Sequence, residues 1–513
     1  MQKVIIGIII LLFNVSIAFA SEDLEMLKKD LQTAKDEKEA AIIHKKIADS
    51  YIAHDDYKTA ADHYVIALDY LRKDLSIDER FKISQYLSWG EKRKESIREL
   101  RLILKDDPNN IKAKIHLARV LSWSGKLDEA IKEAEEVLKE YPENHEALLV
   151  KANALRWRND YRNAIPLYEK IYGKGEDFDA RLGLSYAYLS AGDIQSAKES
   201  GKGLKPEYSY QEKELKEFNY TLNKTIGPII DTRYSYYHDS DDNIVNRYTL
   251  GFGFWLGNWK NDLMYRYTDA KDNLRDTKAQ DVSLRTYSKI AKTVGLGGGI
   301  GLSHVSNNND TDFLTWHLKA DLNVFKGTIG GSITKDTFTD IAELIDNNIR
   351  VLNTTFFISQ QLMDRLSIYS SYSYRDYSDS NNANDFQLST SYAFFKPNPT
   401  LNVGYRFRYL DFNRQSRNGY FDPDDFMSHQ LFISMYFETK RFYGYFEPFG
   451  GHQSYRRYGE KNDDIIGGGY GLIGMNLSRR ISLELSGEGG NYALGTAGGW
   501  NYYMVGFRLL LYL

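Results

Sequence analysis

Residues 401–410 read LNVGYRFRYL, and in this stretch apolar and polar side chains alternate. Leu401 and Val403 fall on one face of an extended strand, whereas Asn402 and Arg406 fall on the other. In a soluble sandwich the apolar face of such a strand turns inward, and in a membrane barrel it faces lipid. The alternation therefore predicts a two-sided strand but does not choose between these two settings.

The same period of two recurs throughout the chain after residue 224. The runs are about 10 to 15 residues long, which suits a tilted membrane span better than a soluble strand of five or six residues. Sixteen runs are expected, and an even number returns both ends of a barrel to one side of the membrane. They begin near Thr225, Ile244, Trp259, Thr277, Val294, Asp312, Thr328, Ile349, Asp364, Asn382, Pro399, Asp424, Arg441, Asp463, Ile481 and Ala497.

The ends of these runs also favour a membrane barrel. Aromatic residues gather there, as in the girdles at membrane interfaces, for example at Tyr234, Tyr236, Tyr265, Tyr267, Tyr372, Tyr374, Phe394 and Phe395. Short connections, such as 257–258, 326–327 and 479–480, alternate with longer polar ones, at 239–243, 307–312, 340–348, 414–425 and 458–464. We predict that residues 225–513 form an antiparallel outer-membrane β-barrel of about sixteen strands. A secreted β-sandwich is the alternative.

Residues 21–224 predict a helical repeat. The triplets LSW at 87–89, LSW at 121–123 and LRW at 155–157 lie 34 residues apart, which is the tetratricopeptide period. Gly125 marks a turn between helices, and alanines recur where paired helices approach closely. We expect about five units, the first of them degenerate. Such an α-solenoid presents a concave surface suited to a protein or polymer ligand.

Trp89, Trp123 and Trp157 are the candidate ligand-binding residues of the repeats. The resemblance to tetratricopeptide domains implies that the first helix of each repeat lines the concave groove. The three indoles would then form a ladder with one step per repeat and stack on sugar rings or on apolar side chains of a partner. The alternative is that each Trp packs against the next repeat, as large aromatic residues usually do.

The first twenty residues predict a secretory signal peptide. Lys3 precedes a fully apolar run, and Ala18-Phe19-Ala20 forms an A-x-A cleavage site. The apolar run is shorter than the ~18 residues of a spanning helix, and Asn14 interrupts it.

The overall composition excludes several classes of protein. The 513 residues are 42% hydrophobic and 27% charged, as in folded protein, and the formal net charge of −4 gives no field that would attract nucleic acid. The chain has no cysteine, which excludes disulfide scaffolds, cysteine zinc sites and thiol nucleophiles. Most of the glycines and tyrosines lie after residue 224, and this shift supports a domain boundary there.

The polar face of the barrel strands carries charges that we assign to the lumen, because Arg or Lys facing lipid near the midplane costs about 2–4 kcal/mol. Such a mixed lining attracts a hydrophilic polymer without holding it tightly. Alternatively, the charges pair and brace the wall. The candidate lumen-lining residues are Arg233, Arg266, Arg375, Arg406, Arg408, Glu484, Glu488 and Arg508, with Asp231 and Asp321 on the same face.

No motif predicts an enzyme, a metal site or a cofactor. The glycine clusters at 295–301 and 467–471 lack the strand-to-helix context of a phosphate loop. The only hints of a serine hydrolase are the neighbours Ser303-His304 and the nearby pair His452 and Ser454, and such proximity does not define a triad. Ten scattered histidines without an H-E-x-x-H motif indicate no metal site.

Repeats of the type LSWSGKLDEA (residues 121–130), followed by a Tyr- and Gly-rich barrel, resemble the YaiO-type outer-membrane barrel proteins. The architecture is also similar to the exopolysaccharide-export porins of cellulose and poly-N-acetylglucosamine systems, in which periplasmic repeats precede a sixteen-stranded barrel. The last run, residues 503–513, resembles the C-terminal signal read by the barrel-assembly machinery, with Leu513 in place of the usual Phe. The resemblance implies an outer-membrane protein with its repeats in the periplasm, and as partners membrane lipid and that machinery.

Two functions are compatible with these observations. The first is passage or export of an envelope polysaccharide through the barrel, with the repeats gathering the polymer. The second is a non-conducting anchor whose repeats scaffold periplasmic proteins. A barrel enzyme that modifies surface lipids through His and Ser near the rim is a third and weaker hypothesis.

Overall fold

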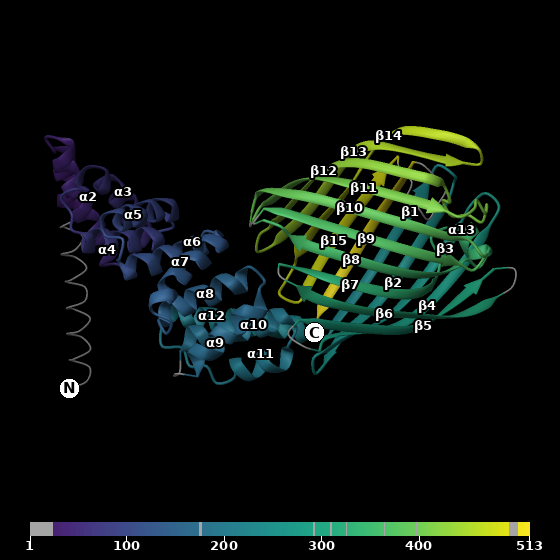
Figure 1. Cartoon of the computed structure of the whole chain (residues 1–513), viewed down its shortest axis with the longest axis horizontal. Helices are drawn as coiled ribbons and strands as arrows, with labels where there is room; N and C mark the ends of the chain where they lie inside the picture. Colours follow the sequence, from purple (N-terminus) through teal and green to yellow (C-terminus); the bar gives the residue numbers. More distant parts are fainter. Residues whose placement is uncertain are drawn as a thin grey trace. The chain divides into compact units, whose positions relative to one another are not determined.

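The computed structural model describes residues 24–173, 177–290, 293–307, 310–324, 326–363, 365–396, 398–491 and 501–513. The predicted signal peptide lies outside these residues. The predicted fold class is confirmed: helical repeats precede a closed antiparallel barrel of sixteen strands (Figure 1). The chain forms two compact units, one of residues up to Arg158 with Pro166–Gly175, the other of Asn159–Ile165 with Glu176–Leu513.

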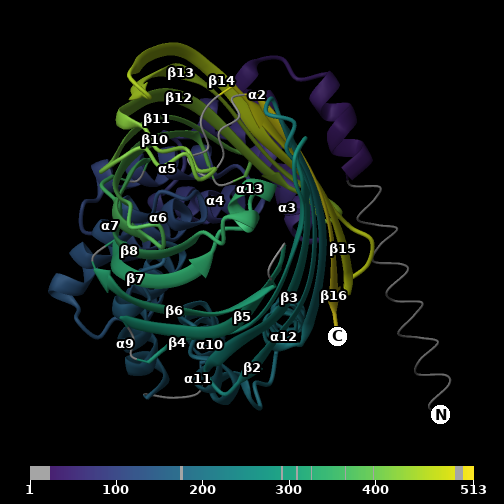
Figure 2. The ribbon, with the colours of Figure 1, turned by 90° about the vertical axis from the view of Figure 1, so that its right-hand side faces the viewer.

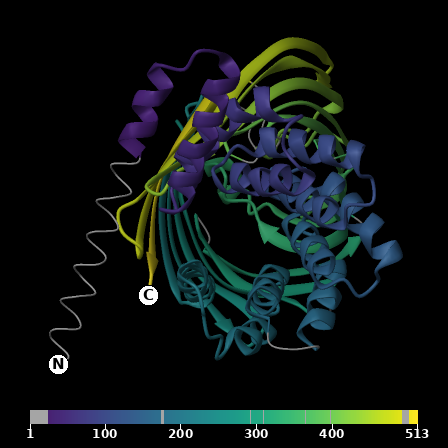
Figure 3. The same cartoon turned by 90° about the vertical axis from the view of Figure 1, so that its left-hand side faces the viewer.

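The repeats are antiparallel helix pairs, of which Figure 3 gives a second view. The paired helices are α2 (Glu37–Ile52) with α3 (Tyr57–Leu71), α4 (Ile77–Trp89) with α5 (Arg93–Asp106), α6 (Ile111–Trp123) with α7 (Leu127–Glu140), α8 (His145–Trp157) with α9 (Tyr161–Tyr172), and α10 (Phe178–Ala191) with α11 (Ile194–Gly201). A single helix, α12 (Ser209–Ile226), follows. Within the described residues no helix is both long and apolar enough to cross a membrane.

The 34-residue period has a backbone cause. Each pair turns on one residue in the left-handed region, namely Asp55, Glu91, Gly125, Asn159 and Gly192, with φ of 58°, 68°, 74°, 64° and 81°. Such a residue ends a helix because a positive φ cannot continue it. The start of the next repeat is fixed as well, since the side chains of Ser76, Asn110, Asn144 and Asp177 cap α4, α6, α8 and α10.

The barrel strands pair in sequence order, and β1 closes the barrel against β16. They are β1 (Ile229–Asp239), β2 (Ile244–Leu256), β3 (Trp259–Lys271), β4 (Asp276–Lys289), β5 (Val294–Ser306), β6 (Thr311–Val324), β7 (Gly327–Thr337), β8 (Arg350–Gln361), β9 (Leu366–Tyr377), β10 (Asn382–Phe395), β11 (Thr400–Phe412), β12 (Asp424–Glu438), β13 (Phe442–Arg457), β14 (Glu460–Asn476), β15 (Ile481–Gly490) and β16 (Tyr502–Tyr512). We call the end where β1 begins the helix end and the opposite end the loop end.

Two sequence expectations about the strands are wrong in detail. The first strand does not begin near Thr225, because α12 continues to Ile226. The connection at 458–464 is not a long loop. Tyr458 and Gly459, both at positive φ, make a two-residue turn between β13 and β14. The expected starts at Asp364 and Ala497 lie outside the described residues.

The outer surface of the barrel is apolar. The outward positions carry large hydrophobic side chains that are substantially exposed, such as Leu302 at 62% and Leu431 at 66%. Others of the same set are Leu250, Phe252, Leu284, Ile300, Leu314, Leu318, Phe356 and Leu485. A wall of this kind has the surface of a barrel that faces lipid.

The loop end is partly closed by two connections that fold into the lumen. The segment between β7 and β8 carries the short helix α13 (Ala342–Asp346), and Figure 2 shows α13 inside the ring of strands. Ala342 and Ile345 pack with Val245 and Ala270 of the wall. On the other side Ile341 and Leu344 belong to a cluster with Tyr420 and Phe421, from the connection between β11 and β12. We call residues 338–349 and 413–423 together the plug.

The last helices are fastened to the helix end of the barrel. Trp255 packs against the cluster of α10–α12 and donates its indole N–H to the Thr225 carbonyl at 2.9 Å. The Asn258 side chain accepts from the Gln195 backbone N–H at 3.0 Å and donates to Asp193 at 3.1 Å. These contacts join α11 and α12 to the β2–β3 hairpin within one compact unit.

Candidate functional site

The strand registers place all the candidate lumen charges on the inward face. Arg233 stands opposite Arg508, Arg266 opposite Asp281 and Glu484 opposite Arg508, while exposed apolar residues occupy the other face. Arg375, Arg406, Arg408, Glu488 and Asp321 share the inward face through the same registers.

Most of these charges are paired. Asp231 accepts from Arg508 at 2.9 Å and also from Arg233, and Arg508 reaches Glu484 at 3.1 Å. This network crosses the closure of the barrel, because β1 and β16 meet there. Arg266 likewise holds Asp281 at 2.8 Å.

Similar pairs occur on other strands around the wall. Asp385 is 1% exposed and lies between Arg375, at 2.6 Å, and Arg408, at 2.8 Å. Arg406 contacts Glu447 at 2.7 Å. Asp321 accepts from Lys289 at 2.6 Å and from the Tyr287 hydroxyl. The ion pairs are the contacts that the wall-bracing interpretation predicts, and the attraction of a polymer by this lining stays a prediction.

The lumen also holds an arc of inward tyrosines that the sequence interpretation missed. Tyr436 donates to Glu438 at 2.6 Å, Tyr443 to Glu484 at 2.8 Å and Tyr502 to Glu488 at 2.7 Å. A fourth pair joins Tyr445 to Glu447, and the Tyr445 ring lies 6.0 Å from that of Tyr470.

In the sequence, the inward tyrosines are marked only by the alternation of side chains that also predicts the strands. On β12 and β13 aromatic residues occupy both faces, so only a correct register separates the lumen set from the outer set.

A cavity of about 620 Å³ opens from the lumen between the inward tyrosines with their glutamates and the inward arginines. Tyr470 and Glu484 line it from β14 and β15, and arginines line it from the first strands and β16. Two of these arginines, Arg247 and Arg285, were not among the predicted residues. Arg285 is exposed and, within the described residues, makes no ion pair and no side-chain hydrogen bond.

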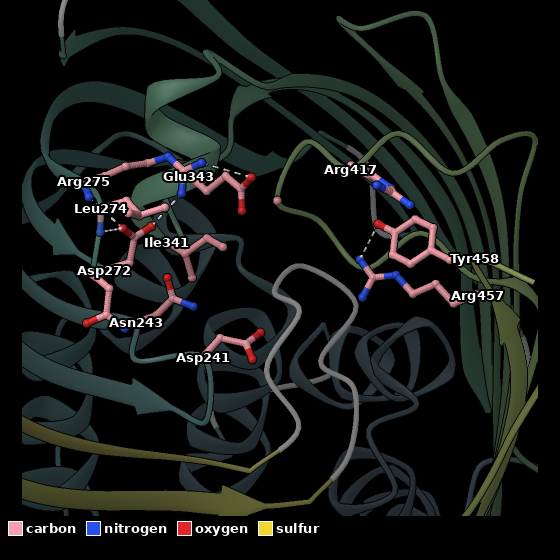
Figure 4. Close-up of a pocket in the computed structure, with 12 residues that line it drawn as sticks. Asp241, Asn243, Asp272, Leu274, Arg275, Ile341, Glu343, Arg417, Arg457 and Tyr458 are labelled. Carbon is pink, nitrogen blue, oxygen red and sulfur yellow. Dashed lines mark hydrogen bonds and ion pairs between the residues drawn. The ribbon is translucent and has the colours of Figure 1, made fainter. Parts of the chain in front are cut away.

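The plug borders a second cavity, of about 550 Å³, at the loop end. Figure 4 shows Asp272, Arg275 and Glu343 on one side and Arg417 and Arg457 on the other.

The charges around this cavity hold the plug in place. Arg275 binds Glu343 at 3.3 Å and Asp346 at 3.4 Å, and Arg247 donates to the Thr339 carbonyl at 3.0 Å. Burial raises the pKa of the Glu343 carboxyl, although Arg275 opposes this shift. Burial also acts on Asp272, but the backbone N–H groups of Leu274 and Arg275 together with the Arg275 guanidinium outweigh it and lower the pKa of that carboxyl.

The three candidate tryptophans lie at equivalent positions, each as the last residue of the first helix of its repeat. Trp89 is 48% exposed and Trp157 is 40% exposed, whereas Trp123 is half-buried. Trp89 is supported edge-on by Tyr57 and Tyr86, and Arg156 lies 5.3 Å from the Trp157 ring. The accessible rings leave the ligand-binding hypothesis open for Trp89 and Trp157.

The serine and histidine that are adjacent in the sequence, Ser303 and His304, lie on opposite faces of the barrel wall. Ser303 points inward, is buried and bonds Thr337 at 2.8 Å, whereas His304 points outward and bonds Asp312 at 2.8 Å. His452 contacts Asp463 on the outer face. Among the described residues no group of three or more potential metal ligands comes together.

Comparisons with known proteins found family models and solved structures that are similar to parts of this chain. Tetratricopeptide repeat family models match residues 91–155 and 151–212. One similar solved structure is a bacterial polysaccharide outer membrane secretin, with 10% identity, a TM-score of 0.45, and coverage of 56% of this chain and 98% of that one. No curated protein matches the chain.

Two further solved structures are similar. One is CdiB from Acinetobacter baumannii, with 11% identity, a TM-score of 0.38, and coverage of 56% of this chain and 60% of that one. The other is a tetratricopeptide repeat protein from Parabacteroides merdae, with 14% identity, a TM-score of 0.31, and coverage of 39% of this chain and 78% of that one.

Proposed function

We propose that this chain is an outer-membrane barrel through which an envelope polysaccharide passes, with its helical repeats in the periplasm. The observation that carries the proposal is the arc of tyrosines hydrogen-bonded to glutamates on the inner wall of β12–β16. An aromatic face stacks on the apolar face of a sugar ring, and a neighbouring carboxylate accepts from the ring hydroxyls.

The spacing of these pairs suits movement rather than capture. They are distributed along the lumen, from Tyr436 and Tyr443 near the helix end to Tyr502 near the loop end. Several weak sites in series let a polymer enter and leave, whereas one tight site would retain it. The repeats add exposed indoles at Trp89 and Trp157, which suit the same kind of ligand.

Conductance of the purified full chain in a planar bilayer tests the proposal. We expect a current that oligosaccharides block from the helix-end side. The double variant Tyr445→Ala with Tyr470→Ala should weaken this block by about thirtyfold, because it removes two stacks of about 1 kcal/mol each. Tyr392→Ala on the outer face of β10 is the matched control and should leave the block unchanged. Equal block of all three proteins would reject the tyrosine arc as a sugar path.

A second function, a non-conducting anchor whose repeats scaffold periplasmic proteins, is favoured by the plug. Its apolar contacts reach both walls, and Arg247 and Arg275 tie it to the strands. This function predicts no current from the full chain and a current only when residues 338–349 are removed. It also predicts that pull-down through the repeats recovers proteins rather than glycans.

A further inference from the structure

Three side chains on the outer face of the β5–β6 hairpin form a hydrogen-bonded chain at the loop end. Ser306 Oγ lies 3.2 Å from Nε2 of His304, and Nδ1 of the same ring lies 2.8 Å from Oδ1 of Asp312. The hydroxyl, imidazole and carboxylate thus occur in the order and with the ring polarity of a serine-hydrolase triad.

The strand geometry brings them together. His304 and Ser306 are two residues apart on β5 and therefore share a face. Asp312 stands directly opposite His304 in the register of β5 and β6. The adjacent pair Ser303-His304, which the sequence suggested, cannot cooperate because neighbouring residues of a strand point to opposite faces.

We propose that Ser306, His304 and Asp312 form a site that hydrolyses acyl esters of membrane lipids. The location indicates the substrate class. Leu302 and Leu314, which are opposite each other in the next register position on the same face, are 62% and 55% exposed and belong to the apolar outer wall. The His304 and Asp312 side chains are 41% and 79% exposed, so the triad lies where this wall meets the polar loops. The ester groups of a lipid occupy this boundary, between the acyl chains and the headgroup.

A cation completes the site. Lys278 of β4 is exposed, stands opposite Ser306 in the register and shares its outward face. Side chains at such paired positions are about 5 Å apart at Cβ, so the ammonium group of Lys278 is within reach of a lipid phosphate or of the oxyanion that forms at the ester carbon.

The reaction proceeds in two balanced steps. The Ser306 oxygen attacks the ester carbonyl carbon while Nε2 of His304 takes the hydroxyl proton, and Asp312 stabilises the imidazolium through Nδ1–H. The bond to the lipid alcohol breaks, this alcohol leaves with the proton from Nε2, and the acyl group stays on Ser306. Water then attacks the acyl group, Nε2 takes and returns one proton, and a fatty acid and free Ser306 result.

The chain contains a matched control for this site. His452 and Ser454 on β13 have the same spacing and also point outward, and an aspartate, Asp463, lies on the adjacent strand. There, however, it is Nε2 of His452 that contacts the carboxylate. Since Nε2 is the atom that faces the hydroxyl at His304, we expect Ser454 to be inactive.

The experiment uses the full chain folded in detergent micelles that contain phospholipid. We expect the wild-type chain to release fatty acid. Ser306→Ala and His304→Gln should each lower the rate of release at least about 100-fold, and Ser454→Ala should leave it unchanged. A fluorophosphonate probe should label the wild-type chain at Ser306, as mapped by peptide mass spectrometry, and should not label Ser306→Ala. Heat-modified migration on gels establishes that each variant is folded.

Two results would overturn the proposal. One is the absence of both fatty-acid release and probe labelling in a folded wild-type chain. The other is a rate that Ser306→Ala does not lower. Hydrolysis of a short water-soluble ester without hydrolysis of phospholipid would reject the lipid as the substrate. None of these outcomes depends on conduction through the lumen.

Discussion

His116 is a buried titratable group in the core of the repeats. It is 2% exposed on α6, with Nε2 3.3 Å from Ser88 Oγ and its ring against the Phe81 ring. Burial, with a smaller effect of Arg119, lowers its pKa to about 4, so the folded repeats keep it neutral.

The stability of the repeats should consequently depend on pH. Because the unfolded chain binds the proton near pH 6.5 and the folded chain only near pH 4, the stabilisation is complete above pH 6.5 and is lost as pH falls toward 4. The loss is about 3 kcal/mol. Urea unfolding followed by helical circular dichroism at pH 7.5 and 4.5 measures it. His116→Phe should remove this part of the pH dependence and the exposed variant His145→Gln should keep it. An equal slope in all three proteins would contradict the assignment.

Asp385, at 1% exposure, is the most deeply buried of the ion-paired carboxylates on the described barrel strands. Asp385→Asn leaves Arg375 and Arg408 without their shared counter-charge, and we expect a loss of about 3 kcal/mol, as for other broken buried pairs. The control is Asp276→Asn, whose pair with Lys271 is solvent-exposed and should contribute less than about 0.5 kcal/mol. The urea midpoint of the barrel, read from heat-modified migration, compares them, and similar midpoints would show that Asp385 is not a brace.

Repeats and strands were predictable because each is a periodic element. The LSW triplets mark helix ends set by a left-handed residue, and the strands at Ile244, Trp259, Val294, Asn382, Asp424 and Ile481 begin at their predicted residues. The plug was not predictable in this way, because a connection has no period. Its signal was composition, since the connection at 338–349 is rich in apolar residues such as Ile341 and Leu344, and Phe421 adds another from the connection at 413–423.

Side-chain sites were less predictable than elements. The lumen charges could be assigned to a face from alternation alone, because lipid excludes them. The triad needed the pairing of β5 with β6, which places Asp312 opposite His304 and which no local pattern contains. The inward tyrosines needed the register of β12 with β13 for the same reason.

The plug should control the open area of the lumen. Replacing residues 338–349 with a short Gly-Ser linker removes α13, and we expect conductance to rise several-fold, because the apolar contacts with Val245 and Tyr420 then disappear. Arg275→Gln should produce brief openings rather than a steady increase, since it removes the ion pairs with Glu343 and Asp346 but leaves the apolar contacts of the plug in place. Single-channel recording separates the two cases. A current unchanged by the deletion would mean that the constriction lies elsewhere in the lumen.

The boundary between the two compact units does not coincide with the change from helices to strands. Helices end at Ile226 and strands begin at Ile229, yet α10–α12 form one compact unit with the barrel. The reason is physical, since Trp255 and Asn258 of the β2–β3 hairpin bind α11 and α12 more closely than a linker would. These helices therefore form a rim at the helix end of the barrel.

Truncation distinguishes this arrangement from a boundary at residue 224. We expect a chain of residues 177–513 to fold with an unfolding temperature near that of the full barrel, and a chain of residues 228–513 to unfold several degrees lower, because it exposes Trp255 and leaves the Asn258 side chain without its partners. Heat-modified migration after stepwise heating measures both. Asn258→Ala in the longer chain should account for only part of the difference, since the apolar contacts of Trp255 remain. If the two truncated barrels unfold at the same temperature, α10–α12 belong to the repeats alone.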